Sequence, residues 1–153
     1  MGTRGYQVVI NETGDFKLRQ YNQWDSYPSG QGKSILEYLK KGKLDTYLKN
    51  LNKIPIANEK ELEEVGKDKH WQNNYPYLSR DCGSRIHQMI EDGTVKFVNH
   101  IDEKEAFDWC EGFYTIDFKE GTFKSEYHGT VKTYKLSKLP SVKKYLKDMR
   151  VED

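Results

Sequence analysis

Residues 4–21 read RGYQVVINETGDFKLRQY, and this stretch indicates the fold that we expect for the whole chain. Residues 4–10 are rich in strand-favouring side chains, and residues 16–21 alternate apolar and polar side chains. Between them, NETGD at residues 11–15 has the glycine and short polar residues of a turn. Together the three segments predict a β-hairpin that opens the domain.

The chain after the hairpin contains apolar residues at helical spacing, interrupted by glycine, proline and capping residues. The first predicted helix carries Ile35, Leu36 and Leu39 and ends at Gly42, and the second covers residues 44–51. The third covers residues 58–65 with Asn58 as its cap, and the fourth carries Ile86, Met89 and Ile90 and ends at Gly93. Pro140 opens the last helix, which has Val142, Tyr145, Leu146 and Met149 on one face. Residues 67–78 are polar and aromatic without a period, so we interpret them as a loop.

Further strands are expected in the second half of the chain. TVKFV at residues 94–98 predicts a short strand, and TVKTYKL at residues 130–136 predicts another. WCEGFYTIDF at residues 109–118 and FKSEY at residues 123–127 predict a second hairpin around the turn KEGT. Strands, then helices, then strands indicate a single α+β domain over residues 1–153 with a mostly antiparallel sheet.

Composition narrows the classes of partner. Basic and acidic residues number 25 and 24, and such a balance argues against binding to a nucleic acid polymer. The chain has no apolar run of membrane-spanning length and no apolar signal segment, so we expect a cytoplasmic protein without a membrane partner. Cys82 and Cys110 form no metal-binding pair and fit a reducing compartment, and we predict neither a metal nor a cofactor.

The stretch QWDSYPSGQGKS at residues 23–34 ends like a phosphate-binding loop. The nucleotide-hydrolase loop needs a glycine five residues before Gly32, but Tyr27 stands there, so that motif is absent. A weaker anion site is still expected, because Gly30 and Gly32 leave main-chain amides uncovered at a helix start and Lys33 adds a positive charge. The alternative is a glycine turn that only caps the helix.

A second segment, YLSRDCGSRI at residues 77–86, again places a glycine at a helix start. Asp81 is a natural N-cap for that helix. Arg80 adds positive charge where the helix end is already positive, so a partner anion is expected, either a carboxylate such as Asp25 or a bound phosphate.

Four stretches carry a resemblance to a known family: GTRG at residues 2–5, QYNQWDSYPSGQG at 20–32, LSRDCGSRI at 78–86 and WCEGFYTIDF at 109–118. They resemble a family of small proteins from bacteriophages, bacteria and fungi with GTR, QWDGYPxGQG and SRDxG motifs. The sequence departs from those motifs at Ser26, where glycine is common, and at Cys82, where threonine is common. The family has no assigned activity, so the resemblance implies no catalytic residues, and the Lys- and Tyr-rich segments between the motifs suit a phage protein.

The same residues suggest a site for a phosphate-bearing small molecule. Arg4, Arg80 and Lys33 would neutralise phosphates with the amides of residues 30–32. Trp24 and Tyr27 would stack on a base, and Asp25 or Asp81 would accept hydrogen bonds from ribose hydroxyls. We therefore predict one pocket surrounded by Arg4, Trp24, Asp25, Tyr27, Gln31, Arg80 and Asp81.

The function that this site predicts is sequestration of a nucleotide-derived immune signal by a phage-encoded, anti-defence protein. A hydrolase or phosphodiesterase that uses Asp25 and Asp81 is the first alternative. An inhibitor that binds a host protein is the second, and its expected feature is an exposed apolar patch. The sequence leaves the ligand and the oligomeric state open, a homo-oligomer included.

Overall fold

The computed structural model describes residues 2–151, and its centre is a five-stranded sheet that begins with the expected hairpin. The strands are β1 (Gly5–Ile10), β2 (Phe16–Asn22), β3 (Gly112–Asp117), β4 (Thr122–Tyr127) and β5 (Thr130–Lys135). Their order in the sheet is β2-β1-β3-β4-β5, and all neighbouring pairs except β1 and β3 are antiparallel. The α+β class, the mostly antiparallel sheet and the N-terminal hairpin are thereby confirmed.

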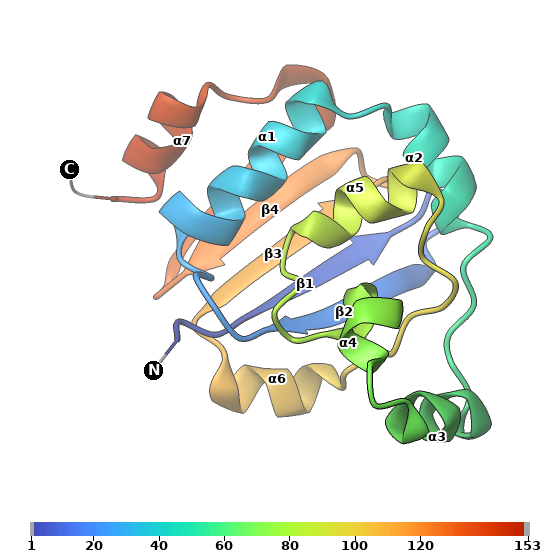
Figure 1. The fold of residues 1–153 in the computed structure, drawn as a ribbon. Coiled ribbons are helices and arrows are strands. Elements are labelled where there is room, and N and C mark those ends of the chain that lie inside the picture. The colour runs from blue at the N-terminus through green and yellow to red at the C-terminus, as the bar shows by residue number, and fades with distance from the viewer. Residues whose placement is uncertain (1, 152–153) are drawn as a thin grey trace.

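The sheet has a thickly covered face and a thinly covered face (Figure 1). The helices of the thickly covered face are α1 (Lys33–Lys41), α2 (Leu44–Leu51), α5 (Arg85–Asp92) and α7 (Val142–Asp148). Their apolar sides pack on Val9, Leu18 and Phe123 of the strands to form the main core. On the other face, α6 (Glu103–Trp109) buries Ala106 against Tyr6 and Val8.

Two further helices lie beside the sheet in the long connection between β2 and β3. The first, α3 (Glu59–Lys67), has the predicted cap: the Asn58 side chain accepts from the Glu61 N–H, and the Glu61 side chain accepts from the Asn58 N–H. The second, α4 (Trp71–Asn74), corrects the prediction of a loop at residues 67–78. The Asp68 carboxylate stabilises this short helix by accepting hydrogen bonds from the His70 N–H and the Asn74 side chain. The helix therefore forms through local polar contacts, although its sequence lacks apolar residues at helical spacing.

The predicted strand at residues 94–98 is wrong. Within residues 2–151 this segment makes one isolated bridge, between Val98 and Ile56, so its strand-favouring side chains do not form a strand without a neighbouring strand to pair with. Phe97 packs on the rings of Tyr75 and Tyr77 at centroid distances of 5.8 and 6.0 Å. The segment then runs along the outer edge of β2, where the Ile101 N–H donates to the Arg19 carbonyl.

The predicted strand at residues 109–118 begins too early, because Trp109 is the last residue of α6 and β3 starts at Gly112. The Asp102 side chain caps α6 by accepting from the Lys104 N–H, and Glu103 and Glu105 favour its positive end. Among the described residues, no helix combines the length and apolar character that crossing a bilayer requires.

Candidate functional site

The four stretches that carry the family resemblance meet at one end of the sheet. The Ser26 N–H donates to the Thr3 carbonyl at 3.0 Å, and the Tyr114 hydroxyl donates to the Ser26 carbonyl at 2.7 Å. The Gln23 N–H donates to the Arg80 carbonyl at 3.0 Å, which joins the tryptophan-bearing stretch to the SRDCG stretch. Hydrogen bonds to main-chain carbonyls thus tie together segments that are far apart in sequence.

Close packing accounts for the glycines of the QWDSYPSGQG stretch. A Cβ atom on Gly30 would collide with the Asp25 carbonyl, and one on Gly32 would collide with the Tyr145 hydroxyl. The N–H groups of Gly30 and Gln31 already donate to the carbonyls of Tyr27 and Asp25, at 3.0 and 2.7 Å. These contacts favour the glycine-turn alternative over an open anion cradle at residues 30–32.

Asp81 is not the N-cap of α5, which corrects the prediction. Ser84 occupies the N-cap position, and its N–H donates to the Gln31 side-chain oxygen at 2.7 Å, so a side chain 53 residues away in sequence satisfies this helix end. The Asp81 carboxylate instead accepts from the Trp24 indole N–H at 2.6 Å. Gln31 also donates to the Trp24 carbonyl, so the three side chains form one network.

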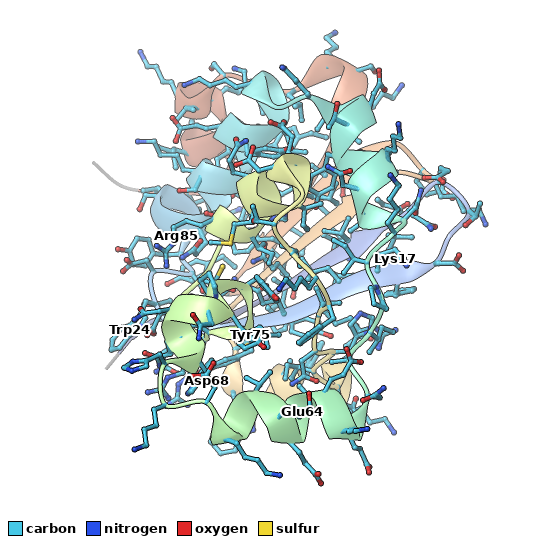
Figure 2. The ribbon with its side chains drawn as sticks, turned by 45° about the vertical axis from the view of Figure 1, so that its right-hand side comes forward. Lys17, Trp24, Glu64, Asp68, Tyr75 and Arg85 are labelled. Atoms are coloured by element: carbon cyan, nitrogen blue, oxygen red, sulfur yellow. The ribbon has the colours of Figure 1, made fainter. Side chains whose placement is uncertain are left out.

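Trp24 lies at the surface with 45% of its area exposed (Figure 2). The neighbouring Asp25 adopts a left-handed backbone conformation, with φ of 55°, and its carboxylate accepts from the Tyr27 hydroxyl at 3.1 Å. This hydrogen bond raises the pKa of Tyr27. Trp24, Asp25, Tyr27, Gln31 and Asp81 are therefore linked by hydrogen bonds in which their polar groups largely satisfy one another. That these residues and the two arginines surround one pocket stays a prediction.

The two predicted arginines lie in a pair of adjoining hollows beside this network. One hollow, of about 100 Å³, contains Arg80, and the other, of about 290 Å³, contains Arg4. Both are lined by Tyr21 and Ile101, so they lie on either side of these two residues. We call the pair the Tyr21 trough, and its main lining residues are Arg4, Gln20, Tyr21, Arg80, Ile101, Glu105 and Trp109.

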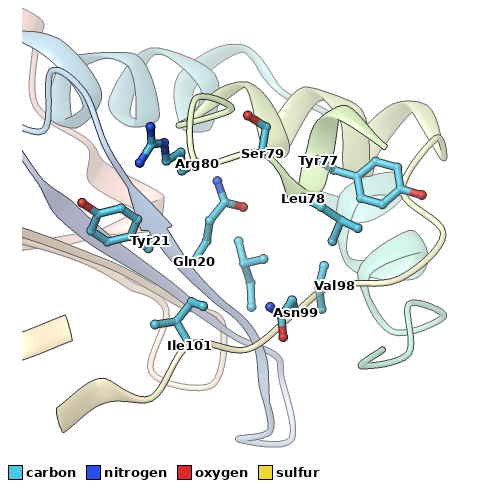
Figure 3. A pocket seen from close by; sticks show the side chains of 10 residues that line it. Gln20, Tyr21, Tyr77, Leu78, Ser79, Arg80, Val98, Asn99 and Ile101 are labelled. Carbon is cyan, nitrogen blue, oxygen red and sulfur yellow. The ribbon is translucent and has the colours of Figure 1, made fainter. Parts of the chain in front are cut away.

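Figure 3 shows Tyr21 and Arg80 at one end of the smaller hollow, with Gln20 beside them. Burial raises the pKa of Tyr21, whereas the positive charges of Arg4 and Arg80 act to lower it, so both guanidinium groups influence the same phenol. The Tyr21 hydroxyl donates to the Gln23 side-chain oxygen at 2.6 Å.

Neither arginine forms an ion pair with a carboxylate of residues 2–151. Within residues 2–151 the ion pairs are Lys144 with Asp148 and His128 with Glu111, and Arg4 and Arg80 take part in none. The Arg4 guanidinium lies 5.8 Å from the centroid of the Trp109 ring, which is 59% exposed. The trough therefore combines two cations that form no ion pair within residues 2–151 with an accessible aromatic face, and the Glu105 carboxylate lines the same hollow as Arg4.

A buried polar network anchors the wall of the trough to the sheet. Gln7 and Gln20 both donate to the Gly83 carbonyl, at 3.0 and 3.2 Å. The Gln7 side-chain oxygen lies 2.7 Å from His87 Nε2, and His87 Nδ1 lies 2.9 Å from the Tyr47 hydroxyl. Since an amide oxygen only accepts, Nε2 carries the proton and Nδ1 accepts from Tyr47. Burial lowers the pKa of His87 to about 3, so the ring is neutral at physiological pH.

The cysteines offer no thiolate at neutral pH. Burial raises the pKa of Cys82 to about 11 and that of Cys110 to about 11 as well. Among the residues that the structure describes, no three His, Cys, Asp or Glu side chains are grouped so that they could share a metal ion.

The sequence analysis missed Tyr21, Ile101 and Trp109 as site residues. Tyr21 and Trp109 belong to stretches that carry the resemblance, but nothing in their local pattern separates them from core aromatic residues. Ile101 enters the site only because its segment follows the edge of β2. Comparison with protein-family models, curated proteins and solved structures found no match.

Proposed function

We propose that the protein binds a phosphate-bearing, nucleotide-derived small molecule in the Tyr21 trough. The observation that supports this is that Arg4 and Arg80, which form no ion pair with any described residue, line the two hollows that share Tyr21. Asp25 was the protein carboxylate expected beside Arg80, but its carboxylate accepts from Tyr27 instead. A bound anion remains the partner that fits Arg80.

The contacts that the trough offers set a rough scale for the affinity. Charge-assisted hydrogen bonds contribute roughly 1.5 to 3 kcal/mol each, and stacking of a base on an aromatic ring such as Trp109 contributes roughly 1 to 3 kcal/mol. Two such bonds and one stack contribute roughly 4 to 9 kcal/mol before ordering costs, whereas micromolar binding needs about 8 kcal/mol after them. We therefore expect these three contacts alone to give binding weaker than micromolar. The two hollows together reach the lower end of the range of about 300 to 1,000 Å³ that is typical of small-molecule sites.

A binder of this kind would withdraw its ligand from other receptors without altering it. The resemblance to phage proteins supports the finer proposal that the protein acts in the host cytoplasm and sequesters a nucleotide-derived immune signal. Glu105 lines the trough as well, and its carboxylate could accept hydrogen bonds from ribose hydroxyls, the role expected of Asp25 or Asp81.

A second candidate function, binding to another protein, is favoured by an exposed aromatic surface on α6. Phe107 is 66% exposed and Trp109 is 59% exposed, and the Phe107 ring lies 5.3 Å from that of Phe113 on the sheet. The hydrolase alternative has less support, because Asp25 and Asp81 each already accept a hydrogen bond from an aromatic side chain.

The test is to incubate the purified protein with a panel of nucleotide-derived signals, denature it by heat and analyse the supernatant. We expect one ligand to be depleted on incubation and to be released intact on denaturation. Appearance of a new product would identify an enzyme, and depletion of no ligand would favour the protein-binding candidate.

Arg80→Ala is the variant that tests whether Arg80 contributes to ligand binding. It should weaken binding roughly 10- to 100-fold, the equivalent of one charge-assisted contact. Since Arg80 is exposed and forms no ion pair with the described residues, the melting temperature without ligand should stay near that of the parent. Lys60→Ala, at an exposed site on α3, is the charge-matched control and should leave binding unchanged. A large loss of stability in Arg80→Ala would make Arg80 a structural residue and contradict the proposal.

A further inference from the structure

The outer edge of β2 is covered by other segments on both sides of Tyr21 but not at Tyr21 itself. On one side the Ile101 N–H donates to the Arg19 carbonyl, at 3.0 Å. On the other side the Gln23 N–H donates to the Arg80 carbonyl, also at 3.0 Å. These two bonds are at Arg19 and Gln23, and the gap between them, an uncovered stretch of edge, is centred on Tyr21, the residue that lines both hollows.

The alternation of an antiparallel pair shows which way the main chain of Tyr21 points. β2 pairs with β1, and along such a strand successive residues direct their N–H and C=O groups to opposite sides. Arg19 and Gln23 direct theirs away from β1, since both bond to the covering segments. Tyr21, midway between them, therefore also directs its N–H and C=O outward, and within residues 2–151 no hydrogen bond from either covering segment reaches these two groups.

This gap is unlike an ordinary solvated sheet edge because of what surrounds it. Arg4 and Arg80 lie in the hollows on either side, and both influence the Tyr21 phenol. The Trp109 ring lines the larger hollow together with Tyr21. A donor and an acceptor thus lie side by side on a main chain that is flanked by two cations and an aromatic face.

We propose that the main-chain N–H and C=O of Tyr21 bind the edge of a nucleobase, so that the trough recognises the base of its ligand and not only the phosphate. This inference rests on the proposed function. Every nucleobase presents a donor and an acceptor next to each other on its pairing edge, and the outward N–H and C=O of one strand residue match such a pair. The arginines take the phosphate, and the ligand is a nucleotide rather than a sugar phosphate or inorganic phosphate.

The first test measures amide exchange in the protein without and with AMP. In the free protein the Tyr21 amide should exchange faster than those of Gln20 and Asn22, which face β1. Saturating AMP should slow exchange at Tyr21 by at least tenfold. Slow exchange at Tyr21 in the free protein would show that the gap is closed and would overturn the inference.

The second test compares ribose 5-phosphate with AMP, GMP, CMP and UMP by calorimetry. We expect at least one nucleotide to bind tenfold or more tightly than ribose 5-phosphate. Equal affinities would overturn the inference and leave the proposed function standing, whereas binding of none of the five probes would overturn both.

Two variants of Tyr21 separate its main chain from its ring. Tyr21→Ala keeps the N–H and should keep the preference for a base over ribose 5-phosphate. Tyr21→Pro removes the N–H at an edge position where proline is tolerated, and should lose that preference. A preference that persists in Tyr21→Pro would overturn the inference. If Tyr21→Pro does not fold, the exchange measurement and the comparison of probes decide it.

Discussion

His87 is fully buried, bonded on both ring nitrogens and neutral, and this state should make the stability of the protein depend on pH. Burial lowers its pKa in the folded protein to about 3, against about 6.5 in an unfolded chain. Below pH 6.5 the unfolded state therefore binds a proton that the folded state does not. The stability that the neutral ring contributes is complete above pH 6.5 and is lost progressively as the pH falls toward 3.

We expect the free energy of unfolding to fall between pH 6.5 and pH 5 by up to about 1.4 kcal/mol per pH unit. Urea titrations at several pH values would measure this slope. His87→Gln should be less stable than the parent at pH 8 but should lose the part of the slope between pH 6.5 and 5 that His87 contributes. His100, whose pKa burial also lowers, should supply the slope that remains. An exposed control, His70→Gln, should keep it. A parent protein with constant stability over this interval would show that His87 is not buried as described.

At the scale of elements, the start of α1 packs on its neighbours through a glycine. A Cβ atom on Gly32 would lie within 3 Å of atoms of Tyr145 in α7 and Tyr114 in β3. Gly32→Ala should therefore destabilise the protein by about 1 to 3 kcal/mol, the usual cost of overpacking. At this chain length each kcal/mol lowers the melting temperature by about 2 to 4 °C.

Gly66→Ala is the matched control for Gly32→Ala. Gly66 lies in α3 and has open space around its Cα, so alanine there should be neutral or stabilising by up to about 1 kcal/mol. Calorimetric melts of the two variants would separate packing from helix propensity. Equal effects of the two substitutions would contradict the packing argument.

The capping box makes α3 a second test at this scale. Val65 is its one buried residue, so this helix should open locally at a low free energy. Asn58→Ala should cost α3 about 1 kcal/mol and speed exchange of its amides about fivefold, with little change in the global unfolding transition. Asn58→Asp keeps an acceptor at the cap and should exchange like the parent. Unchanged exchange in Asn58→Ala would mean that the cap does not stabilise the helix.

At the scale of the whole molecule, the sheet joins the two ends of the chain. In the sheet, β1 lies between β2, its hairpin partner, and β3. Although β3 begins about ninety residues after the end of β2, it pairs with β1 and runs parallel to it. Each end of the chain is therefore needed to complete the sheet that the other end begins.

We expect this interleaving to give one cooperative unfolding transition. Far-ultraviolet circular dichroism and tryptophan fluorescence should report the same urea midpoint, since the three tryptophans, Trp24, Trp71 and Trp109, are spread along the connection between β2 and β3. Two separate midpoints would contradict the single domain that the sequence predicts.

Elements with local signals could be predicted from the sequence. The hairpin follows from alternation around NETGD, α1 and α5 from the spacing of their apolar residues, and the cap of α3 from Asn58. Each of these signals lies within one turn of a helix or one strand, so neighbours in sequence suffice to decide it. The short helix α6 also had such a signal in Asp102 and its acidic first turn, and the sequence analysis overlooked it.

Long-range packing sets which distant groups meet. The Gln31 side chain accepts from the N–H of Ser84, the N-cap residue of α5, which lies 53 residues later, and Asp81 accepts from Trp24. No local pattern encodes these two partnerships. The trough exists because the segment that ends at Ile101 and the turn at Arg80 both pair with β2 and leave Tyr21 uncovered between them. Arg4 and Arg80 were predicted site residues, and their role in binding stays a prediction. Their position on either side of Tyr21 depends on long-range strand pairing. Such pairing is set by how the whole chain packs and not by the residues that neighbour each arginine in sequence.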